Sequence, residues 1–143
     1  MKALVVGGTG FIGSYLVRAL LDVGNDVRVL DLEKRFLEGF EHQKLEFIAG
    51  SMLDRKLVEK TVEGVDVLYH LAHWPRAGHE VYEPFRFEDT LEEFINNITG
   101  TAHLLEASRR HKVKQFIYTS SAVAYGIQEG IDLNEESCCH PEN

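Results

Sequence analysis

The sequence predicts an α/β fold in which helices cover both faces of a doubly wound parallel sheet. Apolar runs of strand length alternate with stretches of helical periodicity along the chain, which is the pattern of such a sheet. The run from Val65 to Ala72 is almost unbroken, as expected for a strand buried on both faces. The first run, Ala3 to Val6, passes directly into a glycine-rich turn. We therefore expect residues 1–143 to form a single three-layer domain, close to the commonest domain size.

In the first half of the chain, strands are expected at about 2–6, 26–30 and 45–49. Residues 33–44 are charged and have no clear period, so we expect a loop there with room for one short helix. A helix joins the first two strands, because one helical face gathers apolar residues and Gly24 follows as a stop signal. That face holds Ile12, Leu16, Ala19, Leu20 and Val23.

The second half begins with a short helix from Asp54 to Glu63 and then the strand from Val65 to Ala72. Residues 73–86 form the longest irregular stretch, and a strand at 115–119 precedes a polar, irregular end from Gly126 onward. Between them we expect a long helix at about 87–110, because apolar residues recur there at helical spacing. These residues are Leu91, Ile95, Ile98, Ala102 and Leu105.

Composition excludes several classes of partner. The formal net charge of −8 argues against nucleic acid and anionic membranes, since both need a basic face. No apolar stretch approaches the length of a membrane span, and the N-terminal apolar run belongs to a strand rather than a signal peptide. The two cysteines, Cys138 and Cys139, are adjacent and form no disulfide framework. We therefore expect a cytoplasmic protein.

The glycine turn reads Gly7-Gly8-Thr9-Gly10-Phe11-Ile12-Gly13, between a strand and a helix. In dinucleotide-binding domains one glycine allows the tight turn, one lets the backbone approach the pyrophosphate, and one lets helix and strand pack closely. The first N–H groups of the helix then face the anion. Asp31 stands at the end of the second strand, where such domains carry an acidic residue.

Five blocks together resemble the extended short-chain dehydrogenases, specifically the NAD-dependent epimerase/dehydratase group and its dihydroflavonol-reductase-like relatives. These blocks are the glycine turn, Val29-Leu30-Asp31, the run 65–72, Asn97-Ile98-Thr99-Gly100-Thr101, and Thr119 to Gly126. They occur in the family's order and cover nearly the whole chain. The resemblance implies a Rossmann sheet with strand order 3-2-1-4-5 and NAD as the cofactor.

The resemblance also assigns roles to individual residues. The backbone N–H groups of Phe11 and Ile12 lie near the pyrophosphate, and Asp31 holds the adenosine ribose and favours NAD over NADP. Lys34 and Arg35 follow closely; they belong either to a solvated loop or to a site for the 2′-phosphate of NADP. Further residues expected to contact the cofactor are Gly7, Gly10, Gly13, Leu32, Ser51, Met52, Leu71, Ala72, His73, Asn97 and Thr119.

Two of these assignments have alternatives. Asn97 either faces the site or makes a structural hydrogen bond from helix to loop. Ser121 matches the family's catalytic serine, whose hydroxyl hydrogen-bonds the reacting oxygen of the substrate. Thr119 and Ser120 are hydroxyl residues of a kind that often only satisfy local backbone groups.

The chain departs from the family's pattern in three places. Ser51 replaces the aspartate that reads the adenine amino group, and His73 replaces a small residue after the fourth strand. The third departure concerns catalysis, because no tyrosine after Ser121 is followed four residues later by lysine. The family's general base is a tyrosine in such a pair, with the lysine lowering its pKa.

Two hypotheses follow for function. In the first, the chain is the NAD-binding portion of a nucleotide-sugar epimerase, dehydratase or reductase, without turnover by itself and with the nucleotide sugar bound in a longer form. In the second, it is a stand-alone module that binds or senses NAD. The apolar stripe of the long helix is either core or a subunit interface, so self-association is expected. No metal site is expected, because Cys138-Cys139-His140 lacks the spacer between zinc-ligating thiolates.

Overall fold

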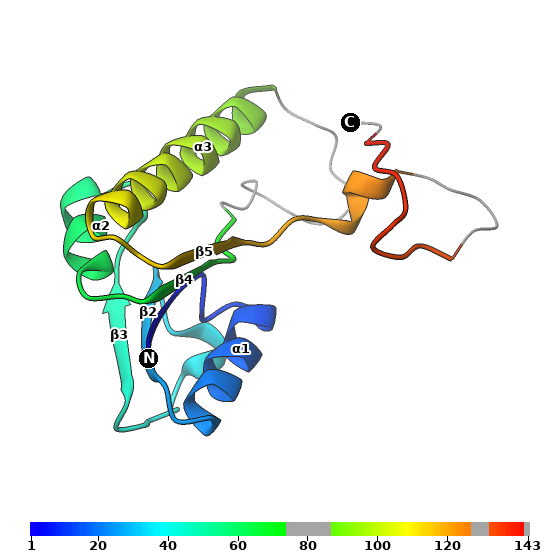
Figure 1. Ribbon diagram of the computed structural model, residues 1–143. Helices are drawn as coiled ribbons and strands as arrows, with labels where there is room; N and C mark the ends of the chain where they lie inside the picture. Colours follow the sequence, from blue (N-terminus) through cyan, green and yellow to red (C-terminus); the bar gives the residue numbers. More distant parts are fainter. Residues whose placement is uncertain (74–86, 127–131, 142–143) are drawn as a thin grey trace.

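The computed structural model describes residues 1–73, 87–126 and 132–141 and contains a parallel sheet of five strands (Figure 1). The strands are β1 (Lys2–Val6), β2 (Asp26–Asp31), β3 (Leu45–Ala49), β4 (Val67–His70) and β5 (Gln115–Tyr118). Their order across the sheet is β3-β2-β1-β4-β5, which confirms the predicted fold and strand order. In the register, Val5 of β1 lies between Val29 of β2 and Tyr69 of β4.

Three α-helices of the described ranges cover the two faces of this sheet. Helix α1 (Phe11–Asp22) lies on one face, and α2 (Arg55–Val62) and α3 (Phe87–Arg110) lie on the other (Figure 1). Strand β1 shows the division directly, because its side chains alternate between the faces. Leu4 and Val6 are buried with α2 and α3, whereas Ala3 and Val5 are buried with α1.

The predicted loop at 33–44 contains the short 3-10 helix η1 (Arg35–Leu37), and a second one, η2 (Ala122–Tyr125), follows β5. Strand β4 is shorter than the predicted strand at 65–72. Val65 lies before β4 and is nevertheless buried. The apolar run therefore indicates burial of the segment that leads into the strand as well as of the strand itself. The predicted irregular stretch at 73–86 lies, apart from His73, outside the described residues. Within the described ranges, no helix combines the length and apolarity needed to cross a membrane.

Candidate functional site

The predicted site residues gather where β1 and β4 end side by side at the centre of the sheet. At this point successive connections leave toward opposite faces, so a crevice opens beyond the carboxyl ends of the strands. Two hollows lie along the crevice and share Ala72 and His73. The predicted residues that line the first hollow are Asp31, Leu32, Ser51, Met52, Ala72 and His73. Those that line the second hollow are Gly7, Gly10, Phe11, Ile12, Gly13, Leu71, Ala72, His73, Thr119 and Ser121.

The glycine turn closes tightly against the end of β4. Gly7 has a φ of 80°, and its N–H donates to the carbonyl of Leu30 at 3.0 Å. A Cβ on Gly7 would lie 2.6 Å from the backbone nitrogen of Ala72. A Cβ on Gly13 would collide with the carbonyl oxygen of Gly7. Side chains are therefore excluded at both positions by backbone, which cannot move aside.

Gly10 differs from these two glycines because its missing side chain leaves open space. A Cβ there would meet only the carbonyl oxygen of Gly7, at 3.4 Å. Gly10 is the N-cap of α1 and provides no capping side chain, and the first turn of the helix, which the structure describes in full, holds no acidic residue. The N–H groups at the start of α1 are thus positioned for an anion from outside the chain.

Asp31 is fixed at the end of β2 by the glycine turn itself. Its Oδ2 accepts hydrogen bonds from the backbone N–H of Thr9 at 3.0 Å and from the Thr9 hydroxyl at 2.6 Å. Its Oδ1 accepts from the N–H of Leu32 at 2.9 Å. Thr9 is fully buried, so it holds the carboxylate in one orientation. Sequence reasoning missed this role, although a threonine inside a glycine turn is a signal for it.

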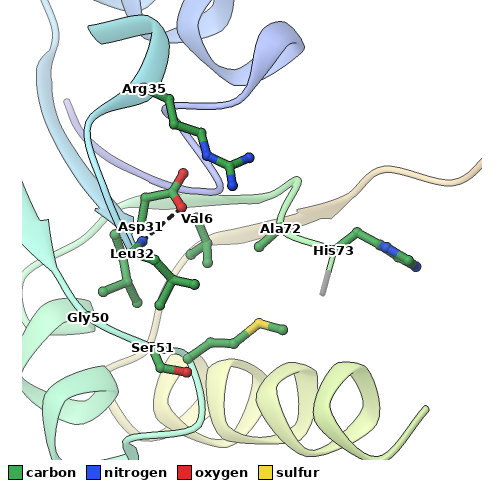
Figure 2. Close-up of a pocket in the computed structure, with 10 residues that line it drawn as sticks. Val6, Asp31, Leu32, Arg35, Gly50, Ser51, Ala72 and His73 are labelled. Atoms are coloured by element: carbon green, nitrogen blue, oxygen red, sulfur yellow. Dashed lines mark hydrogen bonds between the residues drawn. The ribbon is translucent and has the colours of Figure 1, made fainter. Parts of the chain in front are cut away.

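The two basic residues after Asp31 point to different places. Arg35 lines the first hollow beside Asp31, and its Nε donates to Oε1 of Glu33 at 2.8 Å (Figure 2). This hydrogen bond to Glu33 is the main reason that the pKa of Arg35 is raised. The Nζ of Lys34 instead lies 5.7 Å from the ring centroid of Phe47, away from this hollow. Only Arg35 therefore faces a ligand bound next to Asp31.

The first hollow is otherwise largely apolar, and Ser51 lines it below Asp31 and Leu32 in the view of Figure 2. Met52 forms part of its wall and is packed so closely against Gly100 of α3 that a Cβ on Gly100 would overlap the methionine side chain. His103 of α3 also holds this loop, because its Nδ1–H donates to the carbonyl of Met52 at 3.1 Å. A long-range contact with α3 thus fixes the wall.

The second hollow reaches the start of the chain segment after β5. Thr119 donates its hydroxyl proton to the carbonyl of His70 at 3.0 Å, and its N–H donates to the same oxygen at 3.2 Å. This pairing agrees with the alternative that Thr119 satisfies local backbone groups. Ser121 is exposed and lines the same hollow as Gly10.

Asn97 lines neither hollow and instead joins α3 to the segment leaving β4. Its Nδ2 lies 3.5 Å from Nε2 of His73, and the same imidazole nitrogen lies 3.2 Å from Oε1 of Glu93. The helix-to-loop alternative for Asn97 therefore describes the observed contact. His73 lines both hollows, so Asn97 contacts a residue of the crevice wall.

His70, the last residue of β4, is a buried histidine that sequence reasoning did not single out. Its Nε2 lies 2.8 Å from the hydroxyl of Thr101 of α3, and the ring packs edge-on against Phe116 and Tyr118. Its Nδ1 is buried and has no hydrogen-bond partner within the described part of the chain. Burial lowers the pKa of His70 from 6.5 to about 4. The imidazole is therefore neutral at pH 7.

No group of three or more potential metal ligands occurs among the residues that the structure describes. Cys138 and Cys139 are exposed thiols.

Comparison with known proteins identifies a family. A family model described as the NAD dependent epimerase/dehydratase family matches residues 3–143. A UDP-glucose 4-epimerase of Lactobacillus helveticus is 36% identical over 145 residues, which cover 100% of this chain and 42% of that protein. A 3 beta-hydroxysteroid dehydrogenase/Delta 5-->4-isomerase of Mycobacterium tuberculosis is 36% identical over 122 residues, covering 84% of this chain and 31% of that protein.

A solved structure agrees with these relatives. The UDP-glucose 4-epimerase from Bifidobacterium longum, in complex with NAD+ and UDP, superposes with a TM-score of 0.79 at 27% identity. The match covers 98% of this chain and 43% of that one. The chain thus spans less than half the length of these relatives.

The buried imidazole leads to a prediction for pH dependence. Because the pKa of His70 is about 4 in the folded state and 6.5 is its ordinary value, the unfolded chain binds the proton first as pH falls. The contribution of His70 to stability is therefore constant above about pH 6.5 and is lost between there and about pH 4. Urea denaturation across this range should show a smaller decline for His70→Gln than for the wild type. If the unfolding free energies of the two proteins decline in parallel with pH, the lowered pKa of His70 is contradicted.

Proposed function

Because the chain belongs to the NAD-dependent epimerase/dehydratase family, we propose that its crevice binds NAD(H). The pyrophosphate lies over the glycine turn at Gly10, and the adenosine lies in the hollow between Asp31 and Ser51. The observation that carries the proposal is the open space at Gly10, next to the uncapped start of α1. Backbone closes off Gly7 and Gly13, so Gly10 is the position at which we propose that an anion approaches the main chain.

Gly10→Val should abolish NAD(H) binding while leaving the fold intact. The valine Cβ has room, because it meets only one atom at 3.4 Å, but its methyl groups project into the path of the phosphates. Isothermal calorimetry measures the binding, and the thermal unfolding curve of the variant serves as the control for folding. Gly13→Val makes a useful contrast, since the clash with Gly7 should unfold it. Wild-type affinity in Gly10→Val would rule out this position for the pyrophosphate.

The fixed carboxylate of Asp31 supports a preference for NAD over NADP. It sits where a ribose hydroxyl can donate to it, and its charge repels a 2′-phosphate. Arg35 opposes this preference, but its guanidinium is already paired with Glu33 at 2.8 Å. We therefore propose that Asp31 dominates and that Arg35 moderates the preference.

The wild-type protein should bind NADH more tightly than NADPH, by about tenfold or more, which corresponds to about 1.4 kcal/mol. Asp31→Ala should reduce the ratio of NADH affinity to NADPH affinity. Asp31→Asn should reduce it too, because this change removes the charge but keeps an acceptor for Thr9. Arg35→Ala should widen it, whereas Lys34→Ala should leave it unchanged because Lys34 lies over Phe47. Competition binding measures the ratio for the wild type and for each of the four variants. Tighter binding of NADPH by the wild type would contradict the proposal.

We propose that the chemistry served by this site is that of a nucleotide-sugar epimerase, a dehydratase or a related reductase. Bound NAD would supply hydride transfer. The exposed hydroxyl of Ser121, which lines the same hollow as Gly10, would donate a hydrogen bond to the reacting oxygen of the substrate. Proton transfer needs a base, and Ser121 is too weak an acid and base near neutral pH. No residue pair after Ser121 in the 143 residues supplies one.

We therefore expect no turnover of UDP-sugars or hydroxy-ketones by this polypeptide alone, even with saturating NAD(H). Absorbance of NADH together with chromatography of products on the purified protein measures this. Activity that survives purification and disappears in Ser121→Ala would show that another residue serves as base. It would also decide against a module that only binds or senses NAD.

We also propose that the chain pairs with a second copy through α3. Its exposed apolar stripe runs over about four turns and consists of Leu91, Phe94, Ile95, Ile98 and Leu105. Antiparallel pairing of two copies about a two-fold axis buries the same stripe twice, as a two-fold interface requires.

In such a pair the two-fold axis passes near Ile98, the middle of the stripe. Ile98→Glu should therefore give a monomer, since it places two carboxylates against each other at the axis. Val23→Glu, an equally drastic change at the exposed apolar residue that follows α1, should leave the association unchanged. Sedimentation equilibrium distinguishes the two states. A wild-type protein that remains monomeric at high concentration would contradict the pairing.

Finally, we propose the cytoplasm as the compartment, because the two cysteines, Cys138 and Cys139, are adjacent and form no disulfide framework.

A further inference from the structure

Ser51 lines the first hollow together with Asp31, the residue proposed above to hold the ribose. Figure 2 shows Asp31 and Arg35 toward one end, Leu32 between, and Ser51 toward the other. Val6, Leu30, Met52 and Ala72 make much of the remaining surface apolar. With the ribose at Asp31, the polar edge of the purine ring therefore meets Ser51.

The hydrogen bonds of Ser51 leave its hydroxyl proton for a ligand. Its Oγ accepts from the N–H of Leu53 at 3.1 Å, and its carbonyl accepts from the N–H of Asp54 at 3.1 Å. Asp54 in turn caps α2, accepting from Lys56 and Leu57. These bonds order the loop without the proton of the Ser51 hydroxyl. The hydroxyl can also accept a second bond, since an oxygen of this kind has two lone pairs.

This dual capacity matters because purines differ at their six position. Adenine presents a 6-amino donor beside the acceptor N1, whereas hypoxanthine presents a 6-oxo acceptor beside an N1–H donor. A carboxylate accepts only, so it favours the amino group and repels the oxo group. A hydroxyl rotates to donate or to accept. Among the described lining residues Asp31 is the only carboxylate, and it is already held by Thr9 and Leu32.

We propose that the base subsite of this protein accepts dinucleotides of 6-amino and 6-oxo purines about equally, and that Ser51 determines this breadth. The inference rests on the proposed function, since it assumes that the adenosine half of NAD occupies this hollow.

The test compares calorimetric binding of NAD and nicotinamide hypoxanthine dinucleotide. For the wild type we expect the two affinities to lie within about threefold of each other. The corresponding difference in binding free energy is smaller than that of one typical hydrogen bond. Ser51→Asp should favour NAD by about tenfold or more, because its carboxylate still accepts from Leu53 but cannot donate. Ser51→Asn, whose amide both donates and accepts, should retain the wild-type ratio. Ser51→Ala should weaken both ligands by a similar factor.

The outcomes separate this inference from the proposed function. Tight binding of NAD with exclusion of the hypoxanthine analogue would overturn the inference alone, as would a ratio that Ser51→Asp leaves unchanged. If neither dinucleotide binds to the wild type, the proposed function fails and this inference with it. Circular dichroism of each variant verifies folding. Should Ser51→Asp not fold, Ser51→Ala carries the test, and unchanged affinity of that variant for both dinucleotides would overturn the inference.

Discussion

The close approach of the glycine turn to the end of β4 is the constraint on which the crevice depends. Gly7 and Gly13 leave no room for a Cβ, because Ala72 lies against the first and the carbonyl of Gly7 against the second. This contact brings the start of α1 to the centre of the sheet edge, beside the segment after β5. A larger residue at either glycine would separate these elements and open the site.

The same turn also determines the electrostatics of the adenosine hollow. Thr9 leaves the turn on its buried side and fixes the carboxylate of Asp31 through two hydrogen bonds to Oδ2. In the proposed binding mode, anion binding at α1 and ribose recognition at Asp31 are thus coupled through one short segment of backbone. On the far side of the sheet, α3 contributes by holding Met52 through His103, so long-range hydrogen bonds fix both Asp31 and Met52 in the wall of the hollow.

Apolar periodicity and glycine spacing predict the alternating strands and helices and the turn before α1, because these are local signals. The strand order and the gathering of site residues at the crevice are predicted from the family resemblance. The sequence does not predict the pairs that join distant segments. The contact of His70 with Thr101 spans 31 positions, and that of His103 with Met52 spans 51. Nothing in the sequence around His70 or His103 indicates which residue each of them contacts. The sequence likewise leaves Arg35 and Lys34 equivalent, whereas their side chains face different hollows only after η1 forms.

The central claim is that one dinucleotide spans both hollows, and mapping of NMR chemical shifts tests it most directly. Titration of NAD into labelled protein should shift the backbone amides of Gly10, Ile12, Leu32 and Ser51 together, with one common midpoint. Shifts confined to the hollow of Lys34 and Phe47, or to the exposed face of α3, with the glycine turn unchanged, would contradict the account.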